Sequence, residues 1–250
     1  MMENHNELLR RAEDLCRRCE KSGGVTHTAF LTPAERAELE SWARHNASCR
    51  VLFCGGGAES ERCAAFFLPD WMDEESFEAE EYLCAIRLTA FFGAPGHRDY
   101  MGALLGMGIG REWLGDIQVA GETAWVFCMP SVQKHLLSID KVGRCTVRAE
   151  AVALSGVPAP ERQVKEKRFS VQSPRLDAVT AGLFSLSRSE AARQIEAGGV
   201  SVNYRECLKC DLDVREGDVI SLRGKGKGRI IELGGTSRKG RLFISGEVFV

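Results

Sequence analysis

The sequence predicts an α+β protein made of several small mixed domains. Segments with apolar residues at helical spacing alternate with short apolar runs bounded by glycine or proline, which is the pattern of mixed helices and strands. The 250 residues are enough for two or three domains. Charge is divided unevenly: residues 1–80 hold 9 Lys and Arg against 16 Asp and Glu, residues 81–160 hold 7 against 7, and residues 161–250 hold 17 against 12. We therefore expect a polyanion to meet the C-terminal third, and the acidic N-terminal third either to face away from it or to meet a protein partner.

Residues 1–80 are predicted to form a small N-terminal α/β region. Apolar residues recur at helical spacing between Leu8 and Cys19, which indicates a first helix. Thr32, Pro33 and Glu35 have the arrangement of a capping box with proline in the first turn, so a second helix is expected there. Strands are expected at residues 50–54 and 63–68, separated by a three-glycine turn, and an acidic run over residues 70–81 ends the region.

Residues 81–155 are predicted to form a ferredoxin-like or RRM-like domain. The expected elements are a strand at 82–92, a helix at 99–107, strands at 116–120 and 123–129, a helix at 131–139 and a strand at 146–154. The order strand, helix, strand, strand, helix, strand is that of this sandwich fold. Gly156 and the two prolines after it indicate a linker, which is predicted over residues 156–172 and leads to a C-terminal domain at 173–250.

The C-terminal domain is expected to begin with two short helices. Ser187 and Glu190 form a predicted capping box for the second helix, and Gly198 and Gly199 are expected to end it. Ala191, Ala192 and Ile195 supply its narrow apolar face, and the residues left facing outward are Arg188, Ser189 and Arg193. Hydroxyl, guanidinium and the positive end of a helix then lie together, which suits an anion, although a solvated charged face would have the same pattern.

The stretch RLDAVTAGLFSLSRSEAARQIEAGGVSVN, followed by the basic DVISLRGKGKGR, resembles the small RNA-binding module first described in ribosomal small-subunit protein S-four. In that family the helix pair and the following turn bind structured RNA, mostly through phosphates and shape. The resemblance implies RNA contacts from Arg175, Ser187, Arg188, Ser189, Arg193 and Asn203. Phosphate neutralisation is further expected from Arg223, Lys225, Lys227 and Arg229.

A second informative block, HRDYMGALLGMGIGREWLGD, runs from His97 to Asp116. His97-Arg98-Asp99 is similar to a kinase catalytic loop, but Leu104 stands where that chemistry needs a metal-binding Asn. The glycines that follow are not a phosphate-binding loop, because no Gly-Lys-Ser/Thr comes after them. His97, Arg98 and Asp99 are therefore either a capped helix start or a second contact with RNA or the ribosome.

This block extends the resemblance to nearly the whole chain. Together with GGGAESER, DKVGR, RGKGKGR and GGTSRKGR, it is similar to the bacterial YlmH family. The resemblance implies an RRM-like RNA-binding region followed by an S-four domain, association with the large ribosomal subunit, and rescue of stalled subunits that carry peptidyl-tRNA; the family's genes often neighbour cell-division genes. The chain departs from the family at Ser237, which separates Thr236 from Arg238-Lys239, and at the turn from Cys207 to Cys210.

An enzymatic alternative comes from Arg175-Leu176-Asp177, with Thr180 and Gly182-Leu183, which resembles the signature of pseudouridine synthases. There the Asp is catalytic, so Asp177 would act on a flipped uridine. Those enzymes carry the S-four module before the catalytic domain, whereas here the signature lies in the module's own first helix. Leu176, Val179 and Leu183 also have the spacing of a buried helical face. A non-enzymatic RNA-binding protein is therefore preferred.

Cofactors, metals and membranes are not expected. The pairs Cys16/Cys19 and Cys207/Cys210 have metal-like spacing, but they fall in different predicted domains, so a shared zinc site is disfavoured. No apolar run reaches the ~18 residues of a membrane span, and the charged N-terminus lacks the apolar core of a secretory signal. We expect a cytoplasmic protein with reduced cysteines.

Overall fold

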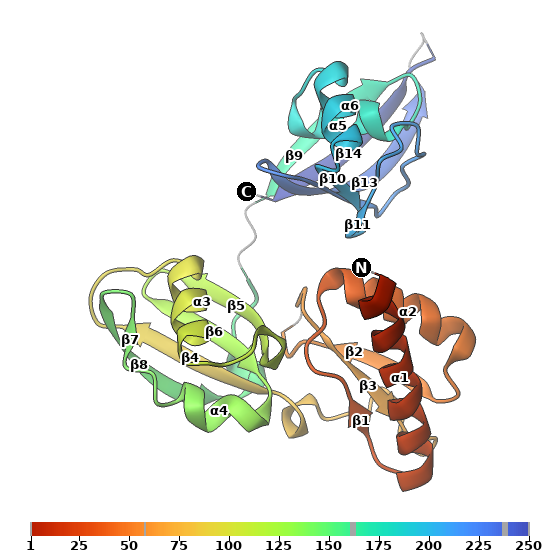
Figure 1. The fold of residues 1–250 in the computed structure, drawn as a ribbon. Coiled ribbons are helices and arrows are strands. Elements are labelled where there is room, and N and C mark those ends of the chain that lie inside the picture. The colour runs from red at the N-terminus through yellow and green to blue at the C-terminus, as the bar shows by residue number, and fades with distance from the viewer. Residues whose placement is uncertain (1, 58, 161–163, 237–239, 250) are drawn as a thin grey trace. The chain divides into compact units, whose positions relative to one another are not determined.

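A computed structural model describes residues 2–57, 59–160, 164–236 and 240–249 (Figure 1). The chain divides into two compact units, Met1–Pro160 and Glu161–Val250. Both mix helices with antiparallel sheets, as the sequence predicts.

The first part of the first unit packs two helices on a three-stranded antiparallel sheet. The helices are α1 (Met2–Ser22) and α2 (Pro33–Asn46), and the strands are β1 (Thr26–His27), β2 (Arg50–Cys54) and β3 (Ala64–Leu68), in the order β1-β3-β2. The predicted capping box of α2 is confirmed: the Thr32 hydroxyl accepts the Glu35 N–H at 3.3 Å, and the Glu35 carboxylate accepts the Thr32 N–H at 2.7 Å.

Strand β3 is buried on both faces. Ala65 and Phe67 belong to the core under α1 and α2, while Ala64, Phe66 and Leu68 belong to a second core shared with the following domain. Side chains alternate across a strand, so a strand covered on both sides needs apolar residues at every position. This explains why the strand is a continuous apolar run in the sequence.

The second part of the first unit has the predicted ferredoxin-like order of elements, with one further two-residue strand before the last. Its elements are β4 (Cys84–Ala90), α3 (His97–Gly106), β5 (Leu114–Ala120), β6 (Thr123–Cys128), α4 (Pro130–Leu136), β7 (Lys141–Val142) and β8 (Cys145–Val152), with single 3-10 turns at Ala79–Glu81, Arg111–Trp113 and Leu154–Gly156. All neighbouring strands are antiparallel, in the order β5-β6-β4-β8-β7. Ile86, Leu88 and Val126 on the sheet pack against Leu104 of α3 and Leu136 of α4.

Two of the sequence blocks that resemble YlmH proteins meet between these two parts. Asp116 accepts the backbone N–H groups of Glu61 at 2.6 Å and Arg62 at 3.3 Å. In return, Arg62 donates to the backbone oxygens of Leu114 at 3.1 Å and Phe30 at 3.0 Å. Desolvation by burial raises the pKa of Asp116 and lowers that of Arg62. These residues therefore join the two parts through charge-assisted hydrogen bonds to backbone.

Replacing Asp116 by alanine in the full chain is expected to lower the free energy of unfolding of the first unit by about 2 kcal/mol. The change leaves two half-buried backbone N–H groups without their acceptor, which typically costs about 1 to 3 kcal/mol for each buried group. Urea unfolding followed by tryptophan fluorescence measures it. The matched control is Asp140→Ala, an exposed residue of the same unit. Equal stability of both variants would show that the Asp116 contacts contribute nothing.

The second unit packs two helices on one six-stranded antiparallel sheet. The helices are α5 (Leu176–Phe184) and α6 (Arg188–Glu196); the strands are β9 (Val164–Val171), β10 (Val200–Val202), β11 (Arg205–Glu206), β12 (Val219–Leu222), β13 (Gly226–Thr236) and β14 (Leu242–Phe249). Their order is β11-β10-β12-β13-β14-β9. The predicted buried face of Leu176, Val179 and Leu183 is confirmed, and it packs on Ile230 and Ile244 of the sheet.

The linker predicted over residues 156–172 is wrong for residues 164–171. Val164–Val171 forms β9 and pairs with β14 along eight residues. Phe169 faces α5, where a Cβ on Gly182 would lie 2.2 Å from its ring, so the absence of a side chain at Gly182 permits the contact. The sequence VKEKRFSV looks like a linker because β9 is an edge strand, on which charged residues are common.

Candidate nucleic-acid interface

Ser187 caps helix α6 at the centre of the predicted site. Its hydroxyl accepts the Glu190 N–H at 3.1 Å, as the capping-box prediction requires. The other half of that prediction is wrong: the Glu190 carboxylate pairs with Arg193 and accepts from Gln194 Nε2 at 3.3 Å. Arg193 and Gln194 follow Glu190 by three and four residues and so lie on the same helix face. They therefore compete with the backbone N–H of Ser187 for the Glu190 carboxylate.

A buried carboxylate holds the two arginines that precede α5 and begin α6. Asp177 is 6 % exposed. It accepts from Arg188 through Nε–Oδ2 at 3.0 Å and Nη2–Oδ1 at 3.3 Å, and from Arg175 Nε at 3.4 Å. The Arg188 side chain is still 57 % exposed and that of Arg175 39 % exposed. Both guanidinium groups are therefore anchored on one side and open to solvent on the other.

The remaining predicted residues of the helix pair are also exposed. Ser189 lies beside Ser187, with 3.1 Å between their hydroxyl oxygens. The side chain of Arg193 is 75 % exposed, and its partner Glu190 is 35 % exposed. We name this set the helix-pair surface: Arg175, Ser187, Arg188, Ser189 and Arg193.

The basic residues of the sheet form a second group. Arg223 and Lys225 lie exposed in the turn between β12 and β13, where the Arg223 N–H donates to the Gly199 oxygen at 2.9 Å, so the turn adjoins the end of α6. Gly228 and Ile230 of β13 are buried towards Leu183 of α5. Lys227 and Arg229 alternate with them and so occupy the opposite face of the sheet. We name Arg223, Lys225, Lys227 and Arg229 the basic-strand surface.

Asn203 makes contacts within the domain. It adopts a positive φ of 48°, its Nδ2 donates to Asp218 at 2.8 Å, and its Oδ1 accepts the Val219 N–H at 3.0 Å. The side chain thus fixes the turn after β10 against β12. Next to it, the Tyr204 ring lies 5.7 Å from the Lys227 ammonium.

His97, Arg98 and Asp99 form the first turn of α3 in the first unit. The Asp99 carboxylate accepts the Gly96 N–H at 2.8 Å, which is the capped helix start that the sequence suggests. His97 and Arg98 are exposed.

The cysteine pairs lie in different units. Cys16 and Cys19 are buried in the core under α1 and α2, and desolvation raises the pKa of Cys19. Cys207 and Cys210 are partly buried beside α6. In the described ranges, no three His, Cys, Asp or Glu side chains are grouped so as to hold a metal ion. Over the same residues, no helix combines the length and apolar character needed to cross a membrane.

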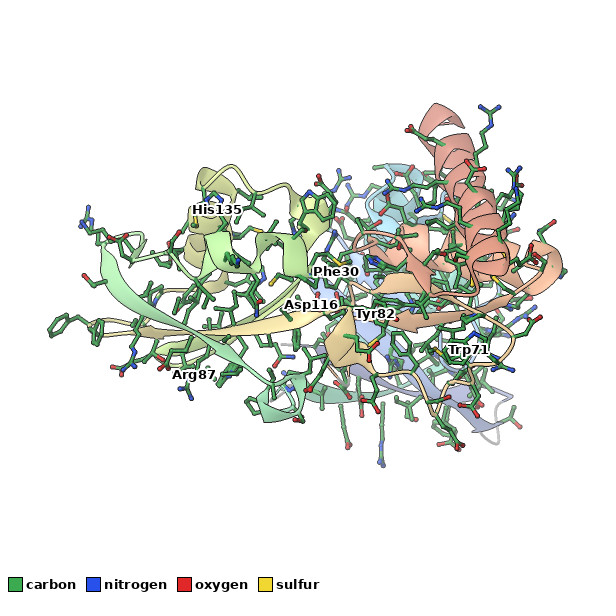
Figure 2. The ribbon with its side chains drawn as sticks, turned by 90° about the horizontal axis from the view of Figure 1, so that it is seen from below. Phe30, Trp71, Tyr82, Arg87, Asp116 and His135 are labelled. Carbon is green, nitrogen blue, oxygen red and sulfur yellow. The ribbon has the colours of Figure 1, made fainter. Side chains whose placement is uncertain are left out.

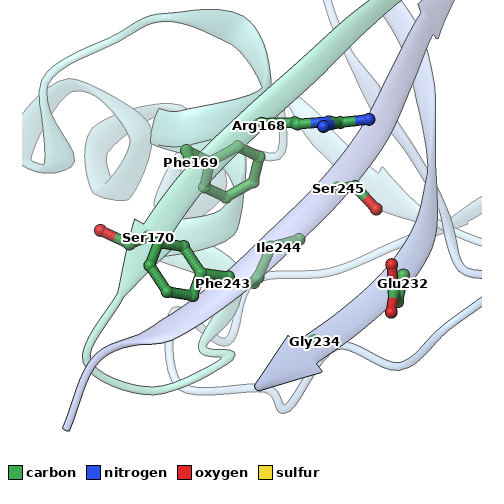
Figure 3. A pocket seen from close by; sticks show the side chains of 8 residues that line it. All are labelled: Arg168, Phe169, Ser170, Glu232, Gly234, Phe243, Ile244 and Ser245. Carbon is green, nitrogen blue, oxygen red and sulfur yellow. The ribbon is translucent and has the colours of Figure 1, made fainter. Parts of the chain in front are cut away.

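A groove of about 630 Å³ lies on the sheet of the second unit, over β9, β13 and β14 (Figure 3). Exposed Phe243 and half-buried Phe169 give it much apolar surface. None of its lining residues belongs to the predicted site. They are Arg168, Phe169, Ser170, Glu232, Gly234, Phe243, Ile244 and Ser245.

Comparisons with known proteins agree with this organisation. Residues 73–156 match the family described as "Putative RNA-binding domain in YlmH", and residues 175–220 match the S4 domain. Ribosome-associated protein quality control protein P2 of Bacillus subtilis (strain 168) is 30% identical over 214 residues, which cover 85% of this chain and 82% of that protein. The solved structure of cell division protein ylmH from Streptococcus pneumoniae is similar with a TM-score of 0.51 and 18% identity, covering 61% of this chain and 93% of the other. The chain belongs to the YlmH family.

Proposed function

We propose that this protein binds structured RNA on the large ribosomal subunit through its helix-pair surface, without catalysing a reaction. It would act in the cytoplasm in ribosome-associated quality control, on stalled subunits that carry peptidyl-tRNA. Support comes from the match to an S4 domain and from the relative whose name places it in ribosome-associated quality control.

The observation that carries this proposal is the anchoring of Arg175 and Arg188 by Asp177. An A-form groove is difficult to read by sequence, so proteins usually meet it through phosphates and shape. A guanidinium presents several donors in a rigid fork that fits phosphate oxygens. Because Asp177 already restricts both side chains, less conformational entropy is lost on binding. The exposed hydroxyls of Ser187 and Ser189 at the N-terminus of α6 add donors at its positive end.

The basic-strand surface supplies further cationic residues for phosphate neutralisation. Its turn adjoins the end of α6, so RNA that follows the helix pair can reach Arg223 and Lys225. Lys227 and Arg229 lie on the sheet face opposite the helices. RNA would contact them only if it continues past the turn between β12 and β13 onto that face. Contacts of this type add affinity and salt dependence without sequence preference.

Asp177→Asn is expected to weaken binding to a structured ribosomal RNA fragment about threefold to tenfold. The change removes one negative charge, so electrostatics alone predicts tighter binding. Weaker binding would therefore show that Asp177 acts by orienting the two guanidinium groups. Asp211→Asn, an exposed residue of the same unit, is the charge-matched control and should bind as tightly as the native chain or tighter. Tighter binding by both variants would contradict the anchoring role.

The same Asp177 variant separates the proposal from uridine modification. Both oxygens of the carboxylate already accept hydrogen bonds from Arg188. We expect a mass-spectrometric survey of uridine isomerisation to find no pseudouridine formed by either protein. Product formed by the native chain and lost in Asp177→Asn would establish a synthase.

Sedimentation with separated ribosomal subunits tests the proposed partner. The native chain is expected to sediment with large subunits and to remain in the supernatant with small subunits. Equal sedimentation with both subunits, or with neither, would overturn the assignment.

A further inference from the structure

The sheet of the RRM-like domain has one face that its helices leave open. The helices α3 and α4 cover the face that carries Ile86, Leu88 and Val126. Figure 2 shows Arg87 projecting on the other side of the sheet from His135 of α4. Arg87 therefore lies on the second face of the sheet, which α3 and α4 leave uncovered.

One end of this face is closed by the N-terminal part of the unit. Phe127 is fully buried there, and a Cβ on Gly56 or Gly57 would lie 2.6 or 2.9 Å from its ring. Phe30 likewise packs within 2.8 Å of a Cβ built on Gly115. The glycine loop, residues 55–57, therefore covers the sheet as far as Phe127.

Beyond Phe127 the face carries two cross-strand rows of mostly polar side chains. Register pairs place Gln118 of β5 beside Trp125 of β6, Trp125 beside Arg87 of β4, and Arg87 beside Glu150 of β8. The next row contains Thr123, Thr89 and Arg148. All of these side chains are partly or fully exposed, so an indole lies in a polar and cationic surface.

Glu150 organises the cations of this surface. Its carboxylate pairs with Arg87 Nη2 at 2.6 Å and with Arg148 Nη2 at 2.9 Å. The hydrogen bond from Arg87 lowers the pKa of Glu150 below its usual range. Because two guanidinium groups share one carboxylate, the net charge next to Trp125 is positive. On the opposite side of Trp125, the Gln118 amide offers both a hydrogen-bond donor and an acceptor.

We propose that this face binds an unpaired RNA nucleotide, with its base stacked on Trp125 and its flanking phosphates on Arg87 and Arg148. Aromatic side chains on a sheet stack bases that are splayed out of a duplex, and arginines beside them track the backbone. A duplex hides its base faces and so cannot use the indole. This inference deepens the proposed function and rests on it, because it gives the chain a second RNA site for single-stranded segments next to a structured element.

The test compares a short RNA hairpin with the same hairpin carrying a single-stranded extension of mixed sequence, both bound to the full chain. The extension is expected to tighten binding by the native chain roughly tenfold or more. Trp125→Leu should lose that gain and bind both RNAs alike, whereas Trp125→Phe should keep most of it. Trp71→Leu, at a more exposed tryptophan of the same unit, is the matched control and should keep the gain in full.

Retention of the full gain in Trp125→Leu would overturn the inference, as would a native chain that binds both RNAs equally. Circular dichroism of each variant checks folding, and Trp125→Phe keeps the aromatic face if the leucine variant unfolds. If the proposed function is wrong, a different result is expected, because the native chain would then not bind the hairpin alone. Trp125-dependent binding of the isolated extension would in that case still support the inference.

Discussion

Replacing Arg188 and Arg193 together by alanine is expected to weaken binding to structured ribosomal RNA by about tenfold or more. Both side chains are well exposed, and each would contribute a charge-assisted contact to phosphate. Each neutralised phosphate releases counterions, so the slope of log K against log salt should become shallower by about two. Fluorescence anisotropy over a series of salt concentrations measures both quantities.

The matched control replaces Arg10 and Arg11, exposed residues of α1, by alanine. This changes the net charge by the same amount at a place outside the proposed site, so the slope should stay close to that of the native chain. Because Arg188→Ala also removes a partner of buried Asp177, thermal melting must accompany the binding curves. A folded double variant with an unchanged slope would remove these arginines from the contact set.

A fragment that begins at residue 173 is expected not to fold cooperatively, whereas one that begins at residue 160 should show a single melting transition. The shorter fragment lacks β9, which pairs with β14 over eight residues. It also lacks Phe169 and Val171, which pack against the core beneath α5. Burying such a side chain contributes about 1.5 to 3 kcal/mol, and the uncovered edge of β14 would favour aggregation.

Calorimetry and size-exclusion chromatography of the two fragments measure this difference. Gly182→Val in the longer fragment provides an independent check, because any Cβ there would clash with Phe169. If both fragments melted at the same temperature, β9 would not be an integral strand of the C-terminal unit.

The fold was predictable where local chemistry and tertiary structure agree. The capping box from Thr32 to Glu35 and the strand at 50–54 satisfy local rules that the structure also satisfies. Strand β9 was not predictable in this way, because its charged residues suit an edge strand and a linker equally well. Only its pairing with β14, more than 70 residues later, distinguishes the two.

The candidate site shows the same division. Exposure of Arg188 and Arg193 follows from the apolar spacing of Ala191 and Ile195 on α6. The anchoring of Arg188 by Asp177 does not follow from the sequence pattern, because it depends on how α5 packs against α6. The face on which Lys227 and Arg229 lie could have been inferred from their alternation with Gly228 and Ile230.

The alternation of residues in β6 indicates which face of the sheet carries Trp125. In β6, Ala124, Val126 and Cys128 face the core, so Trp125 and Phe127 must lie on the other face. What the sequence could not indicate is that the glycine loop covers Phe127 and leaves Trp125 open. That difference arises from packing between the two parts of the first unit.

Crosslink mapping of the full chain bound to large ribosomal subunits tests the central claim most directly. After irradiation and digestion, we expect crosslinked peptides to come from residues 175–193 and 223–229, joined to ribosomal RNA or tRNA. Crosslinks to RNA that spare both segments and fall only in the first unit would contradict the account.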